Sequence, residues 1–123
     1  MNRIIYLLVV LFMPVLMPCS FAQEGTADPE AAYDSIRIIA FEGRLEEAEA
    51  MALGLVGDYP SYGDAIVLLS RIIAWQERYS EAIEILDSLL ADQPGHNDAI
   101  QARNTISEWR SQHRRKKRPP LTQ

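Results

Sequence analysis

One short phrase occurs twice in this chain, 34 residues apart, and it constrains the fold more than any other feature. Pro60 precedes Asp64-Ala65-Ile66 at the same distance as Pro94 precedes Asp98-Ala99-Ile100. A period of this length is typical of solenoids that stack pairs of antiparallel helices. Such arrays offer surfaces to partner molecules, so the period favours binding over catalysis. The same offset also relates Arg44 to Arg78, Glu47 to Glu81, Ala48 to Ala82, Asp58 to Asp92 and Trp75 to Trp109.

The apolar residues recur with helical spacing, and no segment alternates apolar and polar residues as a half-buried strand would. The sequence therefore predicts an all-α solenoid of two helical hairpins followed by a C-terminal capping helix. Asp28 can cap the first helix, and Pro29 suits its first turn. The third helix is apolar nearly all round and must lie between others, whereas the last has one narrow apolar stripe. The expected helices cover residues 29–41, 45–56, 62–76, 80–91 and 97–110.

These units resemble the tetratricopeptide repeat, in which position 20 of each 34-residue unit is small and position 32 is proline. Two units begin at residues 29 and 63, and a partial third begins at residue 97. Gly43 falls on the tight turn inside the first unit, where the second unit has Glu77. The resemblance implies a groove, lined by the first helix of each unit, that binds a protein or peptide. It rests on Ala48 and Ala82 at position 20 and on Pro60 and Pro94 at position 32.

A narrower resemblance covers Ala65 to Ala82. This stretch is similar to the N-terminal repeat segment of YaiO-type outer-membrane proteins, which continue into a β-barrel. The present chain stops where those strands would begin, so the resemblance implies an envelope protein but no barrel function. One alternative is that the chain is the separated N-terminal part of such a barrel protein.

Residues 1–22 have the pattern of a secretory signal peptide. Arg3 precedes an apolar run over residues 4–16, and small residues stand at the two positions that a signal peptidase reads. The run of about 13 residues is shorter than the roughly 20 that span a bilayer as a helix. Alternatives are an uncleaved anchor and lipid attachment at Cys19, the only cysteine. The sequence predicts a periplasmic or outer-membrane-associated protein with a polar leader over residues 23–28.

Charge is spread unevenly along the chain. Residues 23–109 hold all seventeen acidic residues and only five arginines, a net charge of −12. Nucleic acid is therefore an unlikely partner for the body, because its phosphates would be repelled. A basic end follows, and we expect residues 111–123 to form a disordered tail that could contact an anionic membrane surface or fold back on the acidic body. Its cations are Arg114, Arg115, Lys116, Lys117 and Arg118.

Three aromatic residues share one register position in successive first helices: Phe41, Trp75 and Trp109. Aromatic side chains repeated along a groove can hold an extended peptide or a glycan by stacking. The alternative is that they pack between the repeats and form part of the core.

Two arginines, Arg37 and Arg71, also share a register position, four residues before Phe41 and Trp75. Paired guanidinium groups suit a carboxylate or another anion, because their N–H groups form a fork that matches two oxygens. The alternative is an ordinary salt bridge to one of the many nearby carboxylates. Tyr33 and Asp64 are further candidates on the same helix faces.

The sequence gives no support for catalysis, a metal or a cofactor. His96 and His113 are the only histidines, and no metal-ligand spacing joins them to further ligands. Phosphate-binding glycine loops and nucleophile motifs are also absent from the sequence.

The expected function is that of an exported scaffold for protein–protein or peptide binding in the bacterial envelope. The alternative is a membrane-associated adaptor of an envelope or polysaccharide export system, held by the basic end. Because arrays of fewer than three units are small, we also expect marginal stability or self-association.

Overall fold

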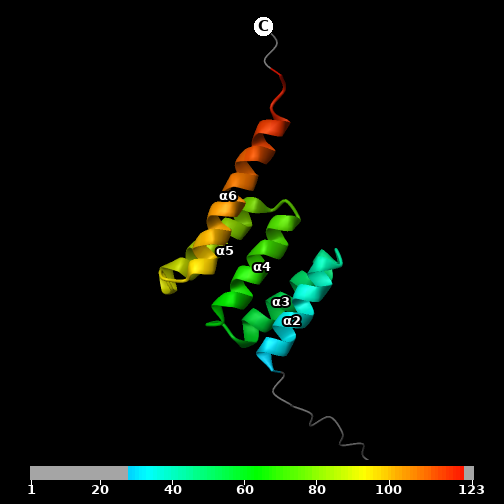
Figure 1. The fold of residues 1–123 in the computed structure, drawn as a ribbon, viewed down its shortest axis with the longest axis vertical. Helices are drawn as coiled ribbons and strands as arrows, with labels where there is room; N and C mark the ends of the chain where they lie inside the picture. The colour runs from blue at the N-terminus through cyan, green and yellow to red at the C-terminus, as the bar shows by residue number, and fades with distance from the viewer. Residues whose placement is uncertain (1–27, 121–123) are drawn as a thin grey trace, which may run out of the picture.

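The computed structural model describes residues 28–120 and contains, within them, five α-helices and no strand. The predicted all-α fold is confirmed, while the predicted signal peptide, Cys19 and most of the polar leader lie outside the described residues. The helices are α2 (Pro29–Phe41), α3 (Leu45–Asp58), α4 (Gly63–Trp75), α5 (Tyr79–Asp92) and α6 (Asn97–Lys117) (Figure 1).

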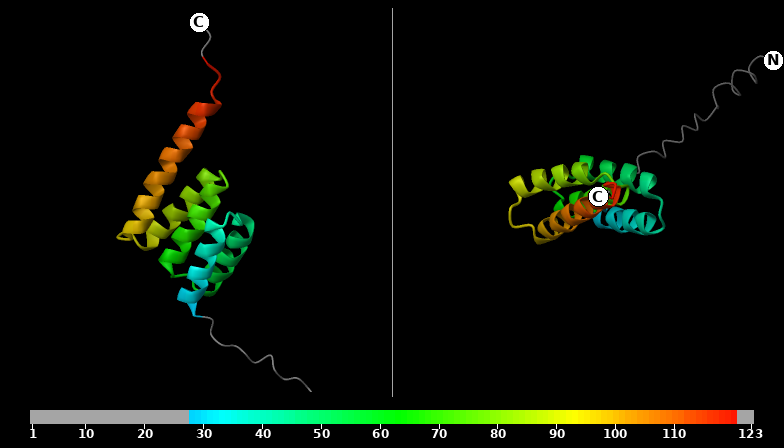
Figure 2. Two further views of the ribbon diagram at one scale, coloured as in Figure 1. Left: turned by 45° about the vertical axis from the view of Figure 1, so that its right-hand side comes forward. Right: turned by 90° about the horizontal axis from the view of Figure 1, so that it is seen from above.

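The helices form two layers. α2, α4 and α6 make one layer, and α3 and α5 make the other, as the view from above shows (Figure 2). Each helix packs on the next in the chain, and α4 also contacts both α2 and α6. This is a solenoid of two antiparallel helix pairs closed by a single helix, as the sequence predicts.

The first helix starts as the sequence predicts, at a capped proline. The Asp28 carboxylate accepts a hydrogen bond from the Glu30 N–H at 3.1 Å, and Pro29 occupies the first turn, where its missing N–H costs nothing.

The two units close their hairpins with the same backbone turn. The Arg44 N–H donates to the Ile39 carbonyl at 3.2 Å, and the Arg78 N–H donates to the Ile73 carbonyl at 3.2 Å. Each turn needs one residue with positive φ: Gly43 has φ 84°, and Glu77 has φ 65°. A side chain in this left-handed region costs roughly 1–2 kcal/mol, a strain that glycine avoids. The backbone thus repeats even where the residue type does not.

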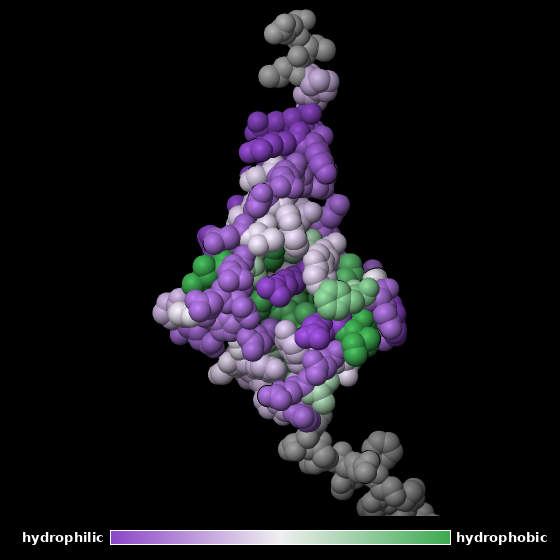
Figure 3. Space-filling model, in the orientation of Figure 1, coloured by the Kyte–Doolittle hydropathy of each residue, from purple (hydrophilic) through white to green (hydrophobic). Residues whose placement is uncertain are grey.

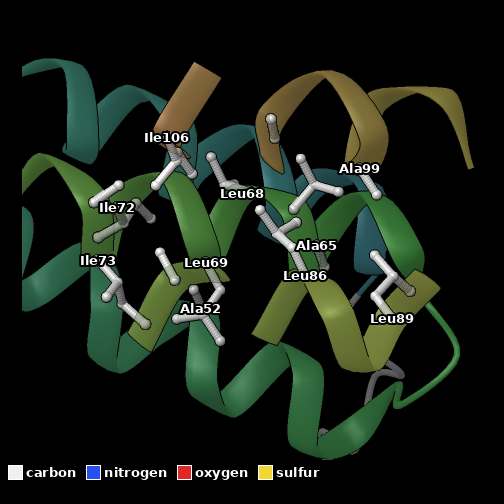
Figure 4. Packing of buried hydrophobic residues seen from close by; sticks show 14 of the residues in the cluster. Ala52, Ala65, Leu68, Leu69, Ile72, Ile73, Leu86, Leu89, Ala99 and Ile106 are labelled. Atoms are coloured by element: carbon white, nitrogen blue, oxygen red, sulfur yellow. The ribbon is translucent and has the colours of Figure 1, made fainter. Parts of the chain in front are cut away.

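The core is centred on α4, which is covered from both sides. Leu68, Leu69, Ile72 and Ile73 are all nearly inaccessible to solvent. Figure 4 shows these side chains between Ile106 of α6 and Ala52 of α3. The one buried polar side chain of the described core, Ser70, is satisfied because its hydroxyl donates to the Ile66 carbonyl at 2.9 Å. The sequence prediction that this helix must be sandwiched is confirmed.

Small residues let the second helices approach the first. Ala48 of α3 and Ala82 of α5, the two residues at family position 20, are both completely buried. A larger side chain at either position would force the paired helices apart, because packed interiors leave no space for added methylene groups.

The last helix is longer than the sequence analysis predicts. α6 continues to Lys117 instead of ending at Arg110, so the prediction of a disordered tail was wrong for residues 111–117. Arginine, lysine and glutamine are good helix formers, and cations favour the negative end of the helix dipole. The His113 ring also packs against Tyr79, with ring centroids 5.5 Å apart. The basic side chains therefore lie on a helix that projects from the body (Figure 1).

A polar contact fastens the first unit to the second. Glu49 on α3 accepts hydrogen bonds from Arg78 at 2.8 Å and from the Gln76 side chain at 2.9 Å. The Glu49 side chain is only 16% exposed. Burial alone would raise the pKa of Glu49, but the hydrogen bonds from Gln76 and Arg78, with the Arg78 charge, lower it below its ordinary value.

Alanine should have opposite effects at two glycines. We expect Gly43→Ala to destabilise the protein by about 1 kcal/mol, because alanine disfavours the positive φ. Gly54 lies inside α3, and an added Cβ would meet no other atom there, so Gly54→Ala should stabilise by roughly 0.5–1 kcal/mol. Urea unfolding of both variants measures the difference, and shifts of the same sign would contradict the assigned turn.

The Glu49 contact should make stability depend on acid. Because the folded-state pKa lies below the ordinary 4.5, its stabilisation is complete above that pH and is lost as the pH falls through the folded-state pKa. We expect Glu49→Gln to cost about 1 kcal/mol at about pH 7 and less at about pH 3, where more of the Glu49 carboxylate is protonated.

The control for this substitution is Glu84→Gln, because Glu84 is exposed on α5 and takes part in no ion pair among the described residues. Unfolding free energies at both pH values make the comparison. An equal loss in both variants would show that Glu49 has no special role.

Candidate functional site

The layer of α2, α4 and α6 presents a hollowed face, which we call the groove face. Figure 3 shows apolar surface in the hollow between these helices, with polar side chains over and around it. A cavity of about 270 Å³ opens there between α4 and α6. Its lining includes Arg71, Trp75 and Trp109, three of the residues that the sequence analysis selected.

The aromatic residues form a row across the groove face. The rings of Phe41 and Trp75 lie 5.9 Å apart and are tilted by 42°. Trp75 and Trp109 line the same cavity and are half-buried, whereas Phe41 is 72% exposed. The two tryptophans thus pack between helices, which was the alternative to a binding role in the sequence analysis. They still leave part of their ring surface exposed to the cavity.

The two groove arginines have no carboxylate partner. Among the described residues, neither Arg37 nor Arg71 takes part in an ion pair. The other arginines of the acidic body, Arg44, Arg78 and Arg103, are each bonded to at least one carboxylate. The salt-bridge alternative is therefore wrong for the two groove positions within residues 28–120.

Tyr33 and Asp64 lie beside these arginines. Burial and the negative charge of Asp64 raise the pKa of the Tyr33 phenol, and the positive charges of Arg37 and Arg71 partly offset that increase. The Tyr33 ring also contacts the ring of Tyr62, with centroids 6.0 Å apart. The mutual electrostatic effects show that α2 and α4 bring these side chains into one region.

Asp64 is not free on the groove face. Its carboxylate lies 3.2 Å from Nε2 of His96, while Nδ1 of the same ring accepts a hydrogen bond from the Ala99 N–H at 3.2 Å. His96 therefore caps the N-terminus of α6 and ties it to α4. Gly63 makes room for the ring, since a Cβ at that position would lie 2.6 Å from His96.

The family model described as tetratricopeptide repeat matches residues 42–106, just over half of the 123-residue chain. The chain belongs to the tetratricopeptide repeat family. No curated protein and no solved structure matches it. Tetratricopeptide repeats generally bind proteins or peptides, and this tetratricopeptide repeat protein is a scaffold for protein interactions.

The repeat register identifies groove residues that the sequence analysis missed. Gln101 and Thr105 line the cavity beside Arg71. They occupy, in the third unit of this tetratricopeptide repeat protein, the register positions of Tyr33 and Arg37 in the first. Extending the 34-residue offset into the last helix would have found both. Tyr62 and His96 gave no such signal, because their roles depend on contacts between different units.

A second cavity, of about 540 Å³, opens away from the groove face. Its apolar lining comes from α3, α4 and α5, and Asp92 is its one charged residue. α3 and α5 form walls of this cavity without packing on each other. The sequence analysis did not predict it, because the repeat pattern gives no sign of this gap. The apolar lining residues are Val56, Ile66, Leu69, Ile85 and Leu89.

The basic end of the chain is unpaired as well. None of the cations from Arg110 to Arg118 forms an ion pair with a described carboxylate. Within residues 28–120, no helix is long and apolar enough to cross a membrane. The same residues contain no group of three or more metal-ligating side chains.

Because Gly63 lies so close to His96, substitutions at the two positions should have non-additive effects on stability. We expect Gly63→Ala to destabilise the protein by about 1–3 kcal/mol, because the added methyl group overlaps the ring. His96→Ser keeps a side-chain oxygen that can cap α6 and removes the ring. The cost of Gly63→Ala should therefore shrink in the His96→Ser background.

Gly95→Ala is the control, because Gly95 lies in the same turn with no atom near its added Cβ. Thermal unfolding of the four variants of the cycle measures the coupling. A full, additive cost of Gly63→Ala in the His96→Ser protein would show that the ring is not what requires glycine.

Proposed function

We propose that this tetratricopeptide repeat protein binds an extended, acidic segment of a partner protein along the groove face. Arg37 and Arg71 hold carboxylates of the segment, and its apolar side chains rest on Phe41, Trp75 and Trp109. The observation that carries the proposal is the unpaired state of the two arginines in a body of net charge −12.

The distribution of charge around Arg37 and Arg71 favours this proposal. A guanidinium group surrounded by carboxylates normally finds one, as Arg44, Arg78 and Arg103 do. Keeping Arg37 and Arg71 unpaired leaves their fork of N–H donors available for two oxygens of a ligand. The surrounding negative charge repels anions elsewhere on the body, so an acidic segment is directed to the groove face.

The aromatic row supplies the apolar part of recognition. Phe41 exposes most of its ring, and the adjoining cavity beside Trp75 and Trp109 is large enough for a single side chain. Aromatic residues with arginine are the residue types that contribute most at protein interfaces. An extended segment would therefore alternate acidic and apolar side chains along the face.

We also propose that the protein acts in the bacterial envelope after removal of residues 1–22. The signal-peptide pattern and the resemblance of residues 65–82 to YaiO-type repeats support this location. In a second role, the projecting basic end of α6 would hold the scaffold on an anionic membrane surface as part of an envelope or polysaccharide export assembly. The unpaired cations of that end favour this role.

Binding of arrayed peptides tests the groove. Acidic peptides with apolar residues should bind, and basic peptides of the same length should not. Replacing both Arg37 and Arg71 with alanine should weaken acidic-peptide binding by at least about tenfold, because each removes a charge-assisted hydrogen bond.

The matched control replaces Arg44 and Arg103, which are paired with carboxylates away from the groove cavity. That variant should bind as the wild type does. Equal binding by both double variants, or a preference for basic peptides, would remove the arginines from the site.

A further inference from the structure

The first helices of the three units carry a common packing stripe. Successive units place equivalent residues at three register positions, 34 residues apart. In α4 and α6 all of these residues are at most 4% exposed, because each helix lies against the unit before it. The stripe consists of Ala65, Leu68 and Ile72 in α4 and of Ala99, Ala102 and Ile106 in α6.

The same stripe is open on α2. Ala31 and Asp34 are exposed, and Ile38 is 58% exposed, whereas its counterparts Ile72 and Ile106 are at most 1% exposed. No helix pair precedes α2 among residues 28–120. α2 therefore presents a face whose spacing already packs on helices twice in this molecule.

We propose that a second copy of the chain covers this face, with the two α2 helices antiparallel about a two-fold axis at the level of Ile36. In that register, residue i of one copy lies opposite residue 72 minus i of the other. Ala31 of each copy then faces Phe41 of the other, and Asp34 faces Ile38. A small residue opposite a large one gives the complementary surfaces that helix packing requires.

The charges on α2 fit the same pairing. Asp34 departs from the stripe, since Leu68 and Ala102 stand at its register position in the later units. In this register Arg37 lies opposite Ser35 of the other copy, one residue from Asp34. Arg37 and Asp34 are then on the same side of the helix pair. Neither residue takes part in an ion pair within the single copy. The two-fold axis would form this Asp34–Arg37 pair twice, and the five N–H donors of each guanidinium group leave Arg37 able to hold a carboxylate of the bound segment as well.

The opposite end of the array does not offer an alternative partner surface. The outward side of α6 carries exposed polar residues, among them Asn104 and Glu108, which stand at the register positions of the buried Ser70 and Ala74 of α4. A second copy stacked head to tail would set the open α2 stripe against that polar side. Pairing of α2 with α2 is a self-complementary contact, which closes at two copies.

The dimer has a consequence for the groove. A two-fold axis perpendicular to both α2 helices keeps the Arg37 side of each helix on the same side of the pair. The two groove faces then open in one direction and adjoin at α2. A stable dimer buries about 800 Å² per partner, and a contact made by one helix of 13 residues should bury less, so we expect a reversible association.

Sedimentation of the full chain over about a hundredfold range of concentration tests the proposal. We expect a monomer–dimer equilibrium for the wild type and a monomer for Ile38→Glu. Leu53→Glu is the control, since Leu53 is 54% exposed on α3 and lies outside the stripe, and it should dimerise normally. Helicity and melting temperature confirm that each variant folds.

A charge exchange tests the register. Asp34→Arg alone and Arg37→Asp alone should each abolish dimerisation, because each sets like charges opposite one another. An equimolar mixture of the two variants should dimerise again, since every cross pair is then attractive. A wild type that stays monomeric at all concentrations, a dimer that survives Ile38→Glu, or a mixture that stays monomeric overturns the proposal. Peptide binding by a monomeric Ile38→Glu protein separates this result from the proposed function.

Discussion

The packing of each first helix on the unit before it is the interaction on which the rest of the structure depends. α4 is covered by α3 on one side and by α6 and α5 on the other, so most of its apolar side chains are buried. Because each unit contacts only its neighbours, the step from one unit to the next is set by this contact alone. A constant step places residues 34 apart in sequence at equivalent points in space.

The groove face is a direct product of that step. Phe41, Trp75 and Trp109 line up because each stands at the same point of its helix, and Arg37 and Arg71 line up for the same reason. The 34-residue period in the sequence therefore predicts the helices and places the groove residues on one face. The family match, over residues 42–106, covers most of the region that repeats.

Features that depend on contacts between units could not be read from the period. Glu49 has Ile83 as its equivalent in the second unit, so its bonds to Gln76 and Arg78 belong to one junction only. The unpaired state of Arg37 and Arg71 could not be predicted either. It depends on the distance from each guanidinium group to the nearest carboxylate, and so acidic a composition would favour ion pairs at both. The end of α6 was misjudged for a different reason. Without an apolar period, helix propensity and dipole charge decide where a helix stops, and both favour extension through Lys117.

Positions where equivalent residues differ between units show which structural constraints apply to one unit only. Glu77 keeps a strained backbone that Gly43 adopts without strain, so the turn geometry is imposed by packing and not by the local residue. Asp34 stands where the other units have apolar residues, on the only first helix whose stripe is open in residues 28–120. The Asp34 carboxylate keeps the uncovered stripe hydrated in a single copy. It also restricts the surfaces that can cover the stripe to those that place a cation beside Asp34. The same substitution thus protects the open end of the array and selects what can occupy it.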